Sequence, residues 1–278
     1  MTETLKELRK LYIIYENLYS LENKINLIFK IDELENKIFN FPNHNFIADD
    51  ILYSLDKKYI FNFSQQIYIL SKLELNNFLQ SKVEKLFLNL IIENLSTKRK
   101  IPYISHCLKG FKLLSESNSA FFRSLFENKD FLSLYSREII IAYSKVSSKE
   151  EDFIFLFSLL KKFPFLKEEI YWGIGSLASP IKNIHLKRII IDEYIKYTLK
   201  YIRKYPNNNI ILENIFYSLL EISFVQSRIS GNIFNQTIST LIKYKTTNIF
   251  QVMLLKSLNN TPLSQEEIFI LNKKRNIY

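Results

Sequence analysis

The segment EEIYWGIGSLASP, residues Glu168–Pro180, is the strongest indication of fold in the sequence. It contains two of the four glycines of the chain, Gly173 and Gly175, and its only tryptophan, Trp172. The apolar run predicts a helix over residues 166–178, in which Trp172 belongs to the core. Because Gly175 has no side chain, a neighbouring helix can approach this one closely. We therefore expect the stretch to be the point where helices pack against one another.

The residues after Gly175 have the pattern of a turn between two helices. Ser179 is expected to cap the next helix, and Pro180 suits the first helical position, where no amide hydrogen bond is lost. The segment Gly175–Pro180 resembles the inter-helix signature of HEAT-like repeats of the phycobilin-lyase type. In that signature an apolar helix ends in Gly, x, Ile or Leu, x, Asp or Ser, Pro. The resemblance implies a HEAT-like α-solenoid that offers a binding surface, not a reaction, and it gives Gly173, Gly175, Ser179, Pro180 and Trp172 a structural role.

The composition of the 278-residue chain independently favours an all-α protein. With 47% hydrophobic and 24% charged residues, burial can offset the entropy of the chain. Only four glycines and six prolines are present, whereas β-rich folds and nucleotide-binding α/β folds need glycine at turns and phosphate loops. Long helices joined by short Asn, Ser and Pro turns need few.

Turn signals divide the chain into roughly a dozen helices. The predicted helices cover about residues 3–39, as one helix or two in series, then 47–58, 64–76, 78–95, 103–116, 118–127, 130–146, 148–163, 166–178, 183–204, 210–226, 232–244 and 247–258, and a last one after residue 264. Ser148-x-x-Glu151 and Ser264-x-x-Glu267 read as capping boxes. Helix pairs in the second half repeat at about 40 residues, which is the rhythm of an α-solenoid of antiparallel helix pairs. An irregular helical bundle is the alternative.

The charge is unevenly distributed, although the whole chain has a net charge of +10. The best internal boundary is the basic, Pro-ended loop at residues 96–102. Residues 1–95 carry a net charge of −2 and form a slightly acidic helical region, whereas residues 96–278 carry +12 and form the basic HEAT-like region, continuous with the first. A basic surface attracts nucleic acid, anionic lipid or an acidic partner.

The segment 182–205 holds the main candidate binding surface. On a helical wheel its basic residues share one face, and tyrosines form a stripe beside it. The candidate residues are Lys196, Lys200, Arg203 and Lys204, with Tyr197 and Tyr201 inside a stripe that also includes Tyr194 and Tyr205. Lysine and arginine neutralise phosphates, and aromatic rings stack on unpaired bases. The alternative is a solvated outer face on which Asp192 or Glu193 pairs with Lys196.

Two further basic segments are expected to be ordinary solvated surface. The first is the loop Lys98–Lys100, which could extend a basic surface together with Lys109 and Lys112. The second is the tail Lys273–Arg275, which is expected to be frayed and exposed.

The sequence argues against catalysis, a metal site or a cofactor. Cys107 is the only cysteine, which excludes disulfides and multi-cysteine zinc sites. His106 and Cys107 are neighbours, and neighbouring helical side chains point about 100° apart, so they form no catalytic pair. The polar N-terminus and the lack of long uncharged runs predict a cytoplasmic protein without a membrane span.

These observations predict a non-enzymatic protein–protein interaction scaffold built on helical repeats, whose partner could be acidic. The alternative is a nucleic-acid-binding protein that uses the basic, tyrosine-edged surface of the C-terminal two-thirds. Alkylpurine DNA glycosylases built from HEAT repeats are also basic α-solenoids, but their cleft pattern has no residue-by-residue match here.

Overall fold

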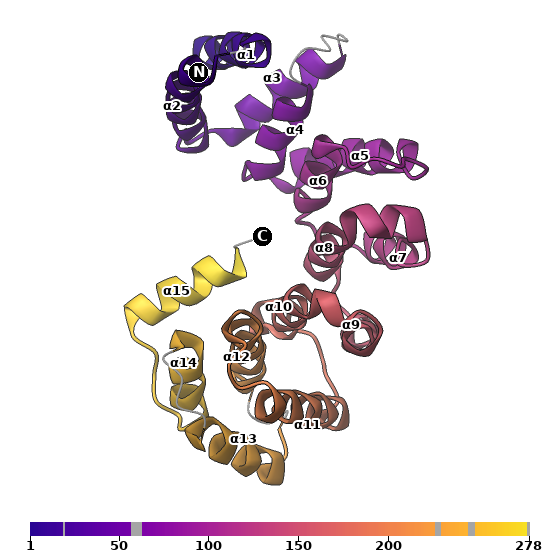
Figure 1. Ribbon diagram of the computed structural model, residues 1–278, viewed down its shortest axis with the longest axis vertical. Helices are drawn as coiled ribbons and strands as arrows, with labels where there is room; N and C mark the ends of the chain where they lie inside the picture. The colour runs from indigo at the N-terminus through magenta and orange to yellow at the C-terminus, as the bar shows by residue number, and fades with distance from the viewer. Residues whose placement is uncertain (19, 57–62, 226–228, 244–247, 277–278) are drawn as a thin grey trace. The chain divides into compact units, whose positions relative to one another are not determined.

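The chain is all-α in a computed structural model, which describes residues 1–18, 20–56, 63–225, 229–243 and 248–276. The structure is 79% helical, and no β-strand occurs among the described residues, which confirms the prediction of an all-α protein. The chain divides into two compact units, residues 1–113 and 114–278 (Figure 1).

The first unit contains six helices in the part that the structure describes. They are α1 (Thr2–Asn17), α2 (Leu21–Phe39), α3 (His44–Asp56), α4 (Phe63–Lys72), α5 (Asn77–Glu93) and α6 (Pro102–Lys109). The predicted segment 3–39 is two helices, α1 and α2, which pack against each other. Helix α6 packs against both α4 and α5, so the basic loop at residues 96–102 lies inside this unit.

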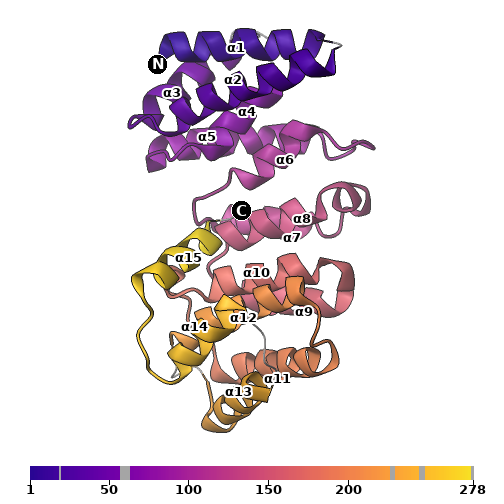
Figure 2. The same ribbon diagram turned by 60° about the vertical axis from the view of Figure 1, so that its left-hand side comes forward.

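The second unit contains nine α-helices among its described residues. They are α7 (Glu116–Ser124), α8 (Lys129–Val146), α9 (Glu150–Lys162), α10 (Lys167–Ala178), α11 (Arg188–Lys204), α12 (Asn209–Ser223), α13 (Gly231–Lys243), α14 (Ile249–Leu258) and α15 (Gln265–Arg275), with short 3-10 helices η1 (Pro164–Leu166) and η2 (Pro180–Lys182). Within this unit α8, α10, α12 and α14 pack in succession (Figure 2). Helix α9 packs on α10, and α11 packs on α13.

The two glycines of α10 face its two neighbours in this row. A Cβ atom on Gly173 would lie 2.3 Å from Ser144 Oγ of α8. A Cβ atom on Gly175 would lie 2.6 Å from the Tyr217 ring and 3.0 Å from Ser218 Cα, both on α12. Helices α8 and α12 can approach the backbone of α10 this closely only because both positions lack a side chain.

The two predicted capping boxes have different outcomes. At α15 the box is present, because the Ser264 hydroxyl accepts a hydrogen bond from Glu267 N and the Glu267 carboxylate accepts one from Ser264 N. The capping box predicted at Ser148 and Glu151 of α9 was wrong by one residue at each position. Lys149 is the N-cap, and Asp152 Oδ2 accepts from both Ser148 N and Lys149 N. Asp152 also accepts hydrogen bonds from two buried hydroxyls, so it is the carboxylate that this site requires.

The helix predicted over residues 183–204 begins later than expected, at Arg188. Pro180 opens only the one-turn helix η2, and Asn183 ends it in the left-handed conformation at φ 50°. The Lys182 ammonium group donates to the carbonyl oxygens of Ser144, Lys145 and Ser147 at the end of α8. A donor is favourable there because the last carbonyls of a helix have no partner within the helix. Burial lowers the pKa of Lys182 to about 7, so the amine serves as a hydrogen-bond donor more than as a full charge.

Candidate functional site

Helix α11 carries the surface that the sequence predicts for binding. It is amphipathic, and its buried residues are Ile191, Tyr194, Ile195, Thr198, Leu199 and Ile202. Lys196, Lys200, Arg203 and Lys204 are exposed. The spacing of three to four residues therefore separates the apolar face from the basic one, as expected for a surface helix.

The tyrosines of α11 do not form a single exposed stripe. Tyr194 is fully buried, and its hydroxyl lies 2.5 Å from Ser218 Oγ on α12, so including Tyr194 in the surface was wrong. Tyr197 and Tyr201 are half-buried, and partial burial raises the pKa of both hydroxyls, which therefore remain neutral. Tyr205, just after the helix, is 44% exposed.

Lysines from two different helices lie over two of these rings. Lys167 Nζ, at the start of α10, is 4.3 Å from the centre of the Tyr201 ring. Lys204 Nζ is 5.2 Å from the centre of the Tyr205 ring. The two rings are 4.9 Å apart and tilted by 43°. Each ammonium group is attracted by the negative face of a neutral ring.

A third lysine extends this arrangement to α9. Lys161 Nζ lies 6.0 Å from the centre of the Tyr197 ring, and Phe157 meets the same ring edge-on at 5.7 Å. Lysines from α9, α10 and α11 thus gather beside one group of tyrosines. We call this surface the lysine–tyrosine edge, and it consists of Lys161, Lys167, Lys204, Tyr197, Tyr201 and Tyr205.

Sequence reasoning missed Lys161 and Lys167. Neither lies within the basic segment 182–205, and only the packing of α9 and α10 beside α11 brings them to its tyrosines. The sequence signal available was the run of lysines around Pro164, which is basic on both sides of a turn. Those lysines predict a basic surface around the turn, but the sequence does not indicate that they lie beside the tyrosines of α11.

Arg203 and Asp192 have structural partners. Arg203 donates to Thr240 Oγ1 of α13 at 2.9 Å, so it joins two helices instead of lying with the lysines. Asp192 accepts a hydrogen bond from Ser230 N at 3.1 Å. The other two candidate lysines, Lys196 and Lys200, stay exposed on the same helix.

The candidate turn residues lie within α10, at its C-cap Ser179 and at the start of η2. Trp172 is fully buried, as predicted, and its Nε1 donates to the carbonyl oxygen of Lys274 at 3.1 Å. Pro180 occupies the first position of η2. The prediction that Ser179 caps the next helix was wrong. Its side chain makes no capping hydrogen bond and is buried near the Glu221 carboxyl group of α12, where burial raises the pKa of that group and Ser179 opposes the rise.

The basic tail was predicted to be frayed and solvated, and this was wrong for two of its three residues. Lys274 is buried, and its Nζ lies 2.5 Å from Glu213 Oε1. Arg275 donates to both oxygens of Glu221, a side chain with no exposed surface. Lys273 alone is exposed, as expected. The opposite charges that bind Lys274 and Arg275 lie more than fifty residues earlier in the chain, so no local pattern signals them.

The residues considered for catalysis lie in the first unit. Cys107 is fully buried, and burial raises the pKa of its thiol well above the usual range. The His106 ring packs edge-on against Tyr68 at 5.1 Å, and burial lowers its pKa. Both environments disfavour the charged forms that nucleophilic and acid–base chemistry use. Within the described ranges, no three metal-binding side chains come together.

The basic loop and its neighbours also lie in the first unit. Lys98, Arg99 and Lys100 are exposed. Lys112 is exposed along its side chain, but its Nζ donates to the carbonyl oxygen of Leu73 at 2.6 Å, and desolvation of the amine lowers its pKa. The Lys112 amine therefore has a partner within this unit.

A comparison of the chain with known family models, with curated proteins and with solved structures finds no match. Across the part of the chain that the structure describes, no helix has both the length and the apolar character of a membrane span.

Proposed function

We propose that the protein is a non-enzymatic interaction scaffold built on HEAT-like helical repeats, and that its lysine–tyrosine edge binds an acidic segment of a partner protein. The observation that carries the proposal is the gathering of Lys161, Lys167 and Lys204 from three helices beside one tyrosine group. Successive packing of α8, α10, α12 and α14 supports the repeat interpretation.

An acidic protein segment fits this edge better than unpaired bases do. Base stacking needs a free aromatic face. The Tyr201 ring already has Lys167 above it and the Tyr205 ring beside it, so its contacts are made within the protein. The ammonium groups remain the available feature, and carboxylates on a peptide satisfy them without displacing the rings. A phosphate backbone remains the alternative ligand, because it also needs only cations.

The test is fluorescence anisotropy with a labelled Glu-rich peptide, single-stranded DNA, duplex DNA and RNA, at low and at about 150 mM salt. The test variant carries Lys161→Glu, Lys167→Glu and Lys204→Glu. The matched control makes the same charge change at exposed lysines of α8, α13 and α15, with Lys129→Glu, Lys243→Glu and Lys273→Glu.

We expect the wild type to bind the acidic peptide at about 150 mM salt. The test variant should bind at least about tenfold more weakly, a loss of about 1.4 kcal/mol. The control should change affinity by less than about twofold. Tighter binding of a nucleic acid through the same three lysines would establish the alternative. If no ligand binds at this salt, or if both variants lose affinity equally, the lysine–tyrosine edge is not the binding site.

A further inference from the structure

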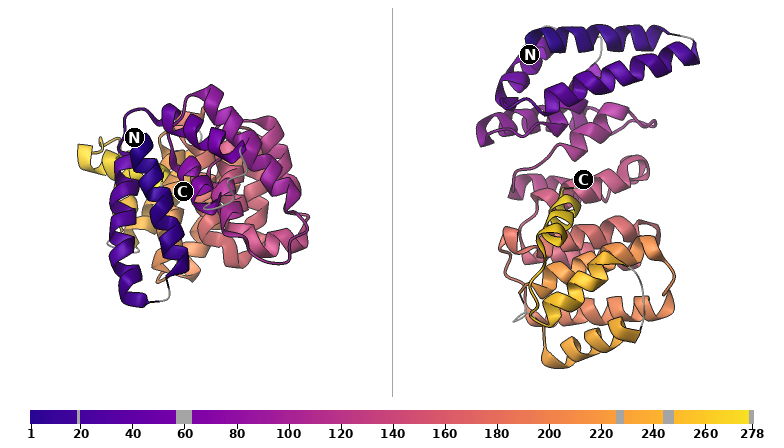
Figure 3. Two further views of the ribbon diagram at one scale, coloured as in Figure 1. Left: turned by 90° about the horizontal axis from the view of Figure 1, so that it is seen from above. Right: turned by 90° about the vertical axis from the view of Figure 1, so that its left-hand side faces the viewer.

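Helix α15 lies on a face that α10, α12 and α14 form together (Figure 3). All three contribute contacts to its last turn. The Trp172 indole of α10 donates to the Lys274 carbonyl oxygen. Glu213 and Glu221 of α12 accept hydrogen bonds from Lys274 and Arg275, respectively, at 2.5 to 2.8 Å. The last turn of α15 is therefore a basic helix end held in an acidic site that contains a tryptophan.

The rest of α15 contributes little apolar contact. Leu271 is its only fully apolar side chain that is buried among the described residues, and the other buried ones are Glu267 and Lys274. Ile268 and Phe269 are 46% and 69% exposed. The Glu267 carboxylate in the first turn of α15 accepts a hydrogen bond from Lys256 Nζ of α14 at 2.7 Å. The helix is thus attached mainly through charged contacts at its two ends, in contrast to the apolar packing between α10 and α12.

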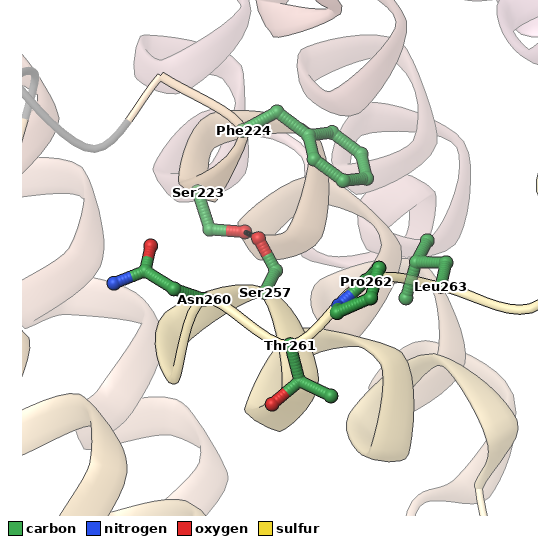
Figure 4. Close-up of a pocket in the computed structure, with 7 residues that line it drawn as sticks. All are labelled: Ser223, Phe224, Ser257, Asn260, Thr261, Pro262 and Leu263. Atoms are coloured by element: carbon green, nitrogen blue, oxygen red, sulfur yellow. Dashed lines mark hydrogen bonds between the residues drawn. The ribbon is translucent and has the colours of Figure 1, made fainter.

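A short connection ties α15 to α14. Asn260 reverses the chain in the left-handed conformation at φ 54°, and Thr261 N donates to the Lys256 carbonyl oxygen at 2.8 Å. Beside this turn the Ser223 and Ser257 hydroxyls join the ends of α12 and α14, next to a pocket of about 460 Å³ (Figure 4). Such a tether keeps a segment at an effective concentration of about 1 mM near its site, so weak contacts suffice to hold it.

We infer that the face formed by Trp172, Glu213, Glu221 and Phe250 is a recognition site for the basic end of a helix in a partner protein, and that α15 is the chain's own occupant of this site. The ligand chemistry is a helix with two consecutive basic residues in its last turn. Lys274 satisfies Glu213 and lies 5.6 Å from the Phe250 ring centre, and Arg275 satisfies Glu221. A partner helix must displace α15 to reach the same groups.

This site is independent of the lysine–tyrosine edge, because it has the opposite charge and different residues. Glu221 carries the specificity. A fully buried carboxylate needs a cation with several donors, and the planar guanidinium of an arginine contacts both of its oxygens. A helix that ends in acidic or apolar residues leaves Glu221 without that partner.

The experiment uses the full chain with Arg275→Glu, which places a second carboxylate against Glu221 and releases α15. The control is Lys273→Glu, the same change of charge two residues away at an exposed position. The probe is a labelled peptide with the sequence of residues 264–276, and the control peptide carries Arg275→Glu. Trp172 is the only tryptophan, so its fluorescence reports on this site alone.

We expect the Arg275→Glu protein to keep its helical circular dichroism while Trp172 emission shifts to longer wavelength and becomes accessible to acrylamide. It should bind the peptide at least about tenfold more tightly than the wild type or the Lys273→Glu protein, in which α15 occupies the site. The peptide should restore the emission, and the control peptide should not bind.

Two results would overturn the inference. One is equal binding of both peptides, or no binding by a folded Arg275→Glu protein. The other is loss of helical content in both Arg275→Glu and the milder Arg275→Ala protein, because α15 would then be a required part of the fold and not a displaceable occupant.

Discussion

The Arg275 guanidinium donates two hydrogen bonds to the fully buried Glu221 carboxylate, which lies 54 residues earlier in the chain. Burial raises the pKa of Glu221, and Arg275 opposes that rise. The pair thus keeps a charge inside α12 that would otherwise be costly to bury.

Replacing Arg275 by methionine should lower the free energy of unfolding by up to about 3–5 kcal/mol at neutral pH, because one partner of a buried pair is lost and detachment of α15 limits the cost. Without Arg275 the pKa of Glu221 rises further. A carboxyl group with a raised folded-state pKa contributes stability below its unfolded pKa of about 4.3, and loses it as the pH rises through the folded value. Urea unfolding should therefore show a smaller loss at pH 5 than at pH 7.5, both relative to the wild type.

Two further variants isolate the cause of this loss. Lys273→Met, at an exposed position of the same turn, should change stability by less than about 0.5 kcal/mol. Adding Glu221→Gln to Arg275→Met should recover most of the loss at pH 7.5, because no buried charge remains. An equal loss at both pH values would show that Glu221 is not responsible.

Replacing Gly175 by alanine adds an overpacking cost of about 1–3 kcal/mol, because the new Cβ atom would crowd the contact between α10 and α12. Better helix propensity returns about 1 kcal/mol, so the net destabilisation should be up to about 2 kcal/mol. Gly231→Ala is the matched control, since a Cβ atom there has no neighbour within 4 Å. It should leave stability unchanged or raise it by up to about 1 kcal/mol. Thermal unfolding of both variants checks this, and a stabilising Gly175→Ala would contradict the close approach.

Replacing Lys182 by methionine should cost about 1–3 kcal/mol, because the carbonyl oxygens of Ser144, Lys145 and Ser147 lose their shared donor. The same change at Lys196, which is exposed, should have an effect below about 0.5 kcal/mol. Urea unfolding of both variants measures the difference. Equal effects would mean that the end of α8 needs no side-chain donor.

The all-α class and most helix ends could be predicted from composition and from residues that are close together in the sequence. Scarcity of glycine predicted an all-α chain, and the box at Ser264 lies where the sequence places it. The capping box of α9 lies one residue later than predicted. Glu151 and Asp152 are adjacent acidic residues, and only Asp152 lies beside the buried hydroxyls that donate to it. After Pro180, the left-handed turn at Asn183 stops a helix that the sequence pattern alone would start.

Contacts between distant segments account for what the sequence did not predict. The basic face of α11 could be recognised from helical spacing, but the lysines of α9 and α10 reach its tyrosines only through packing. The prediction of an exposed tail was wrong because Lys274 and Arg275 pair with Glu213 and Glu221, which lie in the distant helix α12. The HEAT-like repeat interpretation and the binding function remain predictions.

The long separation between Glu221 and Arg275 also has a consequence for biosynthesis. At roughly 5–20 residues per second, the ribosome needs about 3–11 s to add the 54 residues between them. The contacts between α8, α10 and α12 join segments that are close in the sequence, so they can form during this interval. Glu221 has no ion-pair partner until Arg275 has been added. A nascent chain that stalls before residue 275 therefore leaves an acidic site accessible to any basic segment nearby.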